Sequence, residues 1–135
     1  MIYAVIDTNV LVSAVMTKHP ESATTRVLEY IFAKIITPLY DDTIIEEYLD
    51  VLNRPALHIH PIEAQRLVKF IITYGISTER TAFNEVLRDE KDRVFYEVSL
   101  SKENSYLVTG NKKHFPLTPN VVSPAEMIAI IDASD

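Results

Sequence analysis

The chain contains no cysteine, which excludes disulfides, thiolate chemistry and cysteine-based zinc sites. It has only two glycines, and it carries no glycine-rich phosphate loop, no Gly-x-Ser-x-Gly sequence and no His-x-x-x-His zinc pair. No apolar run approaches the roughly 18 residues of a membrane span, and the amino terminus lacks the basic leader of a signal peptide. These absences predict a cytoplasmic protein that does not act at a membrane.

Basic residues are also scarce, because 13 lysines and arginines face 19 acidic residues and give a net charge of −6. A protein that binds nucleic acid by overall charge would be basic. Nucleic-acid binding here would therefore need a bound metal and a local basic rim, and the excess of acid itself fits a site built from carboxylates. The length of 135 residues and the apolar content of 47% predict one domain, residues 1–135, with its own core.

Short apolar runs alternate with amphipathic segments along the chain. Buried strands are expected at residues 2–6, 35–37, 106–109 and 121–122, and an edge strand or loop at 76–83. Helices are expected at residues 10–16 with Asn9 as the cap, 22–32, 42–52, 61–74, 92–100 and from Pro124 onward. This alternation predicts an α/β fold with three layers, α/β/α, around a central and mostly parallel sheet.

Polar residues follow two of the expected strands directly. Ligands of parallel sheets bind beyond the carboxyl ends of the strands, so these positions are candidates for a site. Asp7 follows a buried strand, where an unpaired carboxylate is costly, and it is either a ligand or the cap of the next helix. Thr109 and Asn111 offer a hydroxyl and an amide oxygen, and they belong either to the same site or to a polar surface loop.

Further acids lie in two helical segments. Glu47 either points toward the sheet edge or belongs to an acidic helix start, which the helix dipole favours. Asp89 and Asp92 share one face of a first turn, where Asp89 is also a natural cap. Converging carboxylates could hold a hard divalent cation that activates water for displacement at phosphorus. Spacing does not show whether Asp7, Glu47 and Asp92 converge.

Three basic residues follow the strand that ends near Thr109. Lys112, Lys113 and His114 are consecutive, and such a cluster beside a carboxylate site suits a phosphate backbone. A polar surface loop is the alternative interpretation.

The order of these segments resembles the PIN-domain family, in particular the prokaryotic branch of toxin components of toxin–antitoxin systems. Three segments carry the resemblance: Val5–Leu11, Ile45–Leu52, and Asp89–Arg93 leading into Leu107–Asn111. The resemblance implies a PIN-like fold and a ribonuclease that hydrolyses phosphodiester bonds of single-stranded RNA with Mg²⁺ or Mn²⁺. It also implies an antitoxin protein near the acidic groove and a homodimer.

The resemblance further implies roles for single residues. Asp7, Glu47 and Asp92 match the catalytic acids that hold the metal, and Asp89 matches a further acid of the metal site. The supporting residues would be Thr8, Asn9, Ser13, Thr109 and Asn111, and the nucleic-acid contacts Lys112, Lys113 and His114. Two positions depart from the family pattern, because Asn111 and Ser105 stand where many relatives have an acid. The neutral Asn111 lowers the expected metal affinity.

Two other functions are compatible with parts of the sequence. A catalytically weak PIN-like module that binds RNA or a protein would fit Asn111 and the acidic balance. A receiver-type phosphotransfer domain also gathers acids at strand ends, but it would need a lysine ending a later strand. No lysine directly follows Leu107-Val108-Thr109.

Overall fold

The computed structural model describes residues 1–134, in which strands and helices alternate. The strands are β1 (Ile2–Ile6), β2 (Ile36–Tyr40), β3 (Ile76–Ser77), β4 (Ser105–Val108) and β5 (Val121–Val122). The α-helices are α1 (Thr8–Met16), α2 (Ala23–Phe32), α3 (Asp42–Leu52), α4 (Pro61–Tyr74), α5 (Arg93–Ser99) and α6 (Pro124–Ala133). Single 3₁₀ turns are η1 (Pro55–Leu57), η2 (Glu90–Asp92) and η3 (Lys112–His114).

Within residues 1–134, the strands form one parallel sheet in the order β3-β2-β1-β4-β5. The central strand β1 pairs with both β2 and β4, so that Tyr3 lies opposite Thr37 on one side and Ser105 on the other. The chain runs outward in one direction from β1 to β3 and in the other from β4 to β5. The carboxyl ends of β1 and β4 therefore flank the switch point at which open α/β sheets bind ligands.

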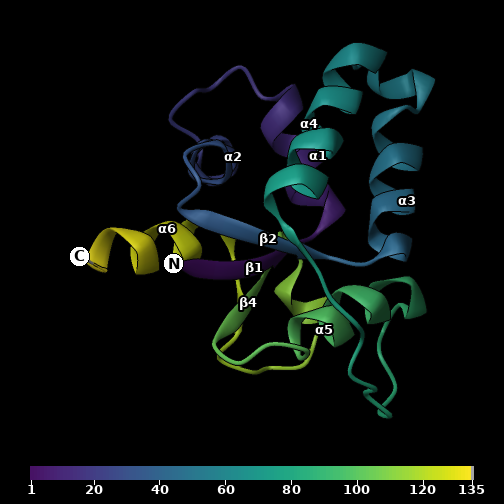
Figure 1. The fold of residues 1–135 in the computed structure, drawn as a ribbon, viewed down its shortest axis with the longest axis vertical. Coiled ribbons are helices and arrows are strands. Elements are labelled where there is room, and N and C mark those ends of the chain that lie inside the picture. Colours follow the sequence, from purple (N-terminus) through teal and green to yellow (C-terminus); the bar gives the residue numbers. More distant parts are fainter. Residues whose placement is uncertain (135) are drawn as a thin grey trace.

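Helices cover both faces of the sheet, which confirms the expected three-layer fold. Figure 1 shows α1, α2 and α4 on one side and α5 on the other. The second half of β1, from Ala4 to Ile6, and the whole of β2 are buried. Continuous apolar runs are typical of parallel strands that are covered on both faces. No helix in residues 1–134 has the length and apolar character that crossing a membrane requires.

Side-chain caps explain where several helices begin. Asp41 Oδ1 accepts a hydrogen bond of 2.9 Å from the Ile44 N–H at the start of α3, and Ser123 and Glu126 form a capping box at α6. The expected cap of α1 is wrong. The helix already begins at Thr8, and the Asn9 side chain leaves the helix to accept a bond of 3.3 Å from the Gly110 N–H.

Three strands differ from expectation, since β4 spans Ser105–Val108 and not residues 106–109, while the expected end of α4 is confirmed. β2 runs from Ile36 to Tyr40 and includes Pro38, and β3 is only two residues long, so most of residues 76–83 is loop. Gly75 ends α4, but with an extended backbone. A Cβ at Gly75 would lie 2.5 Å from the carbonyl oxygens of both Ile71 and Pro38. The glycine is needed there because α4 and β2 approach each other closely, not because of an unusual φ.

Candidate active site at the carboxyl ends of β1 and β4

Asp7 lies at the end of β1 and is buried, with 6% of its surface exposed. Its Oδ2 accepts a hydrogen bond of 2.8 Å from the hydroxyl of Thr109, the fully buried residue that follows β4. The same hydroxyl oxygen accepts the Asn111 N–H at 3.0 Å. Asp7 occupies the cap position of α1, but its side chain makes no capping bond. The capping interpretation is therefore wrong, and the carboxylate joins the ends of β1 and β4.

Glu47 reaches the same region from α3. Its Oε2 accepts a hydrogen bond from the hydroxyl of Thr8, in the first turn of α1, so the side chain points toward the sheet edge. The next residue, Tyr48, is buried and donates its hydroxyl to the carbonyl oxygen of Ile6, which ties α3 to the last residue of β1. Burial raises the pKa of Tyr48 well above its ordinary value, and the charges of Asp7 and Glu47 raise it further.

Tyr48 is a site-supporting residue that sequence reasoning missed. In the sequence it is one member of the apolar stripe of α3. A buried tyrosine hydroxyl needs a hydrogen-bond partner, and that requirement was the available signal. The partner is a main-chain carbonyl 42 residues away, which no local pattern could specify.

Asp92 approaches from η2, directly before α5. Its Oδ2 is buried and has no hydrogen-bond donor within residues 1–134, although His114 Nδ1 lies 3.4 Å away in a contact that does not meet hydrogen-bond geometry. Burial raises the pKa of Asp92, Asp89 and Glu47 raise it further, and His114 opposes them. Asp89 is exposed and uses Oδ1 to accept the Lys91 N–H at 3.0 Å, which confirms its role as a cap.

The carboxylates influence one another electrostatically. Burial raises the pKa of Asp7 from 3.8 to about 6. The Thr109 hydroxyl and the Thr8 N–H lower this pKa, while the charges of Asp92 and Glu47 raise it. Asp7, Glu47 and Asp92 therefore lie within range of one another, although they come from three separate parts of the chain.

A family model described as the PIN domain matches residues 3–113. The chain belongs to the PIN domain family. The match extends from β1 to η3 and includes Asp7, Glu47 and Asp92, and PIN domains are generally nucleases. Family membership replaces the receiver-domain interpretation. Searches of curated proteins and of solved structures returned no match.

PIN domains generally use divalent metal ions, and the donor set of this one fits such an ion. Asp7, Glu47 and Asp92 offer hard carboxylate oxygens, which Mg²⁺ and Mn²⁺ prefer. The buried Asp92 Oδ2 lacks a hydrogen-bond donor in the described chain and so has a free lone pair for a ligand. Within residues 1–134, no group of three or more His, Asp or Glu side chains already has the arrangement of a metal cluster.

The supporting residues of the PIN domain separate into two groups. Thr8, Asn9 and Thr109 make the hydrogen bonds that hold the acidic side chains and the loop after β4. Ser13 is exposed, and its hydroxyl lies 3.4 Å from that of Thr24 near the start of α2, so it contacts α2 instead of the acids. Asn111 is exposed, and its side chain does not cap η3.

Ser105 lies far from the acids along its strand. It is the first residue of β4, whereas Thr109 follows the last, and its buried hydroxyl donates to the carbonyls of Ser99 and Lys102. A serine at this position therefore helps to close the turn between α5 and β4. It makes no contact with Asp7, Glu47 or Asp92.

The three basic residues of η3 do not act as one cluster. Lys112 Nζ lies 2.8 Å from Glu126 Oε1 in an ion pair with α6, which draws its charge away from the acids. Lys113 is exposed, and His114 lies beside Asp92. The structure therefore separates Lys112, which is paired with Glu126, from Lys113 and His114, and phosphate binding by the latter two stays a prediction.

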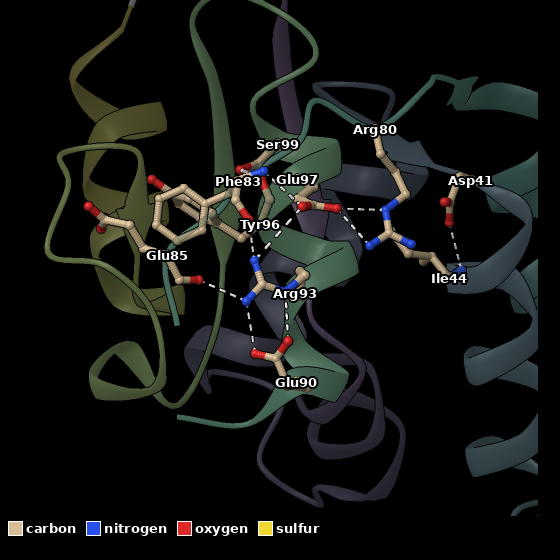
Figure 2. Close-up of polar contacts among 10 residues, drawn as sticks. All are labelled: Asp41, Ile44, Arg80, Phe83, Glu85, Glu90, Arg93, Tyr96, Glu97 and Ser99. Carbon is tan, nitrogen blue, oxygen red and sulfur yellow. Dashed lines mark hydrogen bonds and ion pairs between the residues drawn. The ribbon is translucent and has the colours of Figure 1, made fainter. Parts of the chain in front are cut away.

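An arginine next to Asp92 holds the neighbouring loop in place. Figure 2 shows the Arg93 guanidinium pointing at Glu90 and at the main-chain carbonyls of Phe83 and Glu85. On its other side lies the buried Glu97, whose Oε2 is 3.9 Å from Arg93. The loop before η2, and with it Asp92, is therefore attached to α5.

Glu97 is the second residue that sequence reasoning missed. It is 6% exposed and is bound by Arg80 at 2.6 Å and by the Phe83 N–H at 2.8 Å. Burial tends to raise the pKa of Glu97, but the Phe83 N–H and the two arginines hold it below the usual range. The signal was a carboxylate on a helix in which Phe95, Tyr96 and Val98 are also buried. Such an acid must be paired.

A hollow of the PIN domain lies away from these carboxylates. It has a volume of about 760 Å³ and is lined by α1, α2 and α4, with Phe32 and Phe70 among its residues. Asp7, Glu47 and Asp92 do not line it. The candidate acids therefore lie at the strand ends and not in this hollow.

Proposed function

We propose that this PIN domain is an endoribonuclease that hydrolyses phosphodiester bonds of single-stranded RNA and depends on Mg²⁺ or Mn²⁺. The observation that supports it is the gathering of Asp7, Glu47 and Asp92 at the ends of β1 and β4. There the charges of Asp92 and Glu47 raise the pKa of Asp7, and the charge of Glu47 raises the pKa of Asp92. The family supports the general chemistry, because PIN domains are generally nucleases that use divalent ions.

Asp7, Glu47 and Asp92 would hold the ion, and Asp89 would add negative charge beside Asp92. The bound ion would activate the attacking water and stabilise charge at phosphorus. The chain itself keeps the ligands in place: Thr109 donates to Asp7, and Thr8 donates to Glu47. Such hydrogen bonds from neighbouring residues orient carboxylates before the ligand arrives.

Cleavage of a labelled single-stranded RNA tests the proposal. Wild type should cleave with Mg²⁺ or Mn²⁺, and EDTA or Asp7→Asn should abolish cleavage. Glu47→Gln should reduce cleavage at least a hundredfold, because loss of an oriented metal ligand or its support is costly. The exposed neighbour Glu46 provides the matched control, and Glu46→Gln should cleave like wild type. Cleavage that persists in EDTA and in Glu47→Gln would contradict the proposal.

A catalytically weak PIN module that binds RNA or a protein is the second candidate. Asn111 favours it, because this exposed residue follows Thr109 and Gly110 and supplies no negative charge. The variant Asn111→Asp separates the two functions. A folded wild type that binds RNA without cleaving it, together with cleavage gained by Asn111→Asp, would favour the binding module.

The resemblance to toxin components extends the proposal to a biological role. We propose that the protein is a homodimeric toxin that is held by an antitoxin protein. Induced expression in a bacterial host should slow growth for wild type and not for Asp7→Asn. Light scattering should give twice the 15.4 kDa mass of the chain. Equal growth of both strains would contradict the toxin role. A monomeric mass at working concentration would contradict the homodimer.

A further inference from the structure

His114 lies between the acids and a second hollow. Its Nδ1 is 3.4 Å from Asp92 Oδ2, and its side chain also lines a hollow of about 230 Å³. One wall of this hollow is the loop that runs from Phe83 to Arg88, and the other is the segment that contains Lys113 and Phe115. The hollow thus adjoins the proposed catalytic site, with His114 as the shared residue.

Two cations of the hollow have no partner in the described chain. Within residues 1–134, the side chains of Arg88 and Lys113 make neither an ion pair nor a hydrogen bond, and both residues are exposed. By contrast, Arg93 and Lys112 nearby are paired with acids. Glu85 also lines the hollow, so the lining carries a formal charge of +1 with His114 neutral. The whole chain carries −6.

The remaining lining is apolar and aromatic. Phe83 and Phe115 contribute to the hollow, and Phe83 packs edge-on against Tyr96 with ring centroids 4.9 Å apart. Cations beside aromatic side chains are the combination with which proteins bind single-stranded nucleic acid, because the cations contact phosphates and the rings contact bases or sugars. Phe115 is buried, with 6% of its surface exposed, so Phe83 supplies the accessible ring. The two free cations and this ring therefore indicate the same kind of ligand.

The wall formed by the loop is held in place before any ligand binds. Figure 2 shows that Arg93 contacts the carbonyls of Phe83 and Glu85, while Glu97 accepts the Phe83 N–H. The loop has no helix or strand of its own between Thr78 and Asp89. These side-chain hydrogen bonds hold the loop in place without a helix or strand. Arg88 lies at the end of the segment that they hold.

We propose that this hollow is a substrate subsite that binds the nucleotide next to the scissile phosphate of a single-stranded RNA. Arg88 and Lys113 contact the RNA backbone, the partly exposed Phe83 accepts the base or sugar, and His114 separates this nucleotide from the carboxylates. The inference rests on the proposed ribonuclease function and adds where its substrate lies. It also assigns the phosphate contact to Lys113 and Arg88 in place of Lys112.

RNA binding in the absence of cleavage tests the subsite. The background is Asp7→Asn with Mg²⁺ present, in which cleavage is expected to be lost, and the probe is a labelled oligouridine of about ten nucleotides whose affinity is measured across a salt series. Adding Arg88→Gln or Lys113→Gln should weaken RNA binding roughly three- to tenfold at low salt. Each substitution should also reduce the slope of log affinity against log salt concentration by about 0.7, because it removes one cation that contacts the phosphate backbone. The matched control is Lys69→Gln, an exposed lysine on α4 outside the hollow, which should bind like the background. Circular dichroism checks that each variant is folded.

The outcomes separate the subsite from the catalytic proposal. Variants of Arg88 and Lys113 that bind no more weakly than Lys69→Gln would overturn the subsite, even if wild type cleaves RNA. Weaker binding with a reduced salt slope supports the subsite, even if wild type does not cleave. In a cleaving wild-type background, the same two substitutions should raise KM and leave kcat within about threefold, as expected for residues that bind substrate away from the reacting atoms.

Discussion

The hydroxyl of Thr109 donates a hydrogen bond of 2.8 Å to Asp7 Oδ2 and joins residues that are 102 positions apart in the chain. The bond joins the ends of β1 and β4, the two neighbouring strands at which the strand order reverses. It therefore lies at the edge of the sheet where a ligand is expected to bind. It also lowers the pKa of Asp7, against the larger effect of burial. Thr109 therefore affects both the position of the Asp7 carboxylate and its pKa.

Replacing Thr109 by valine should shift the pH dependence of activity. Thr109→Val keeps the volume but removes the donor, so the pKa of Asp7 should rise further above about 6. A hydrogen bond to a charged group contributes about 1.5–3 kcal/mol, so the acidic limb of metal-dependent RNA cleavage should move upward by roughly 1 pH unit or more. Thr109→Ser retains the hydroxyl and should keep the wild-type profile. An unchanged profile in the valine variant would show that the bond does not tune Asp7.

Asp7 should destabilise the metal-free protein at neutral pH. Burial, with Asp92 and Glu47, raises the pKa of Asp7 from 3.8 to about 6. Between these pH values the folded state retains a proton that the unfolded chain releases, so the free energy of unfolding falls as pH rises through this window. Below about pH 3.8 both states are protonated and no cost arises. Above about pH 6 the cost is on the order of 3 kcal/mol.

Thermal unfolding in EDTA measures this cost. Asp7→Asn removes the charge, so its Tm at about pH 7.5 should exceed that of wild type by roughly 5–10 °C. The difference should disappear near pH 4, where wild-type Asp7 is protonated in the folded state. A Tm for Asp7→Asn below that of wild type at neutral pH would mean that the carboxylate is stabilised by contacts beyond Thr109 and Thr8.

Removing the charge of Glu97 should loosen the loop that carries the hollow and Asp92. Glu97→Gln leaves Arg80 and Arg93 without their shared carboxylate at a site that is 6% exposed. Leaving buried groups unsatisfied costs about 1–3 kcal/mol, which urea unfolding can measure. Hydrogen exchange should increase in residues 78–92. The exposed Glu103 supplies the control, and Glu103→Gln should change neither quantity.

The two glycines should differ sharply in their tolerance of a methyl group. Gly75→Ala places a Cβ 2.5 Å from the carbonyl oxygens of Ile71 and Pro38, and the overpacking should cost about 1–3 kcal/mol in the free energy of unfolding. A Cβ at Gly110 would meet its nearest atom, Asn9 Oδ1, at 3.6 Å, which is ordinary contact. Gly110→Ala should therefore cost less than about 1 kcal/mol. Equal costs would contradict the close approach of α4 and β2.

Local patterns in the sequence were sufficient for the element order and for the candidate acids. The apolar run before Asp7 and the run that ends at Thr109 each marked a buried strand, and Pro124 lies where the last helix begins. Such signals are local because a strand alternates and a cap acts within a few residues of the chain. The resemblance of the segment order to the PIN-domain family is confirmed by the family match.

Only the tertiary structure decided which side chains form hydrogen bonds and ion pairs with each other. Lys112 and Lys113 are adjacent lysines in the sequence, yet the first pairs with Glu126 on α6 while the second lines the hollow beside His114. Likewise Asn9 suits a helix cap, but β4 brings the Gly110 N–H to its side chain. The physical reason is that these bonds join residues 14 and 101 positions apart in the chain. The order of strands in the sheet, which composition and periodicity do not encode, brings those segments together.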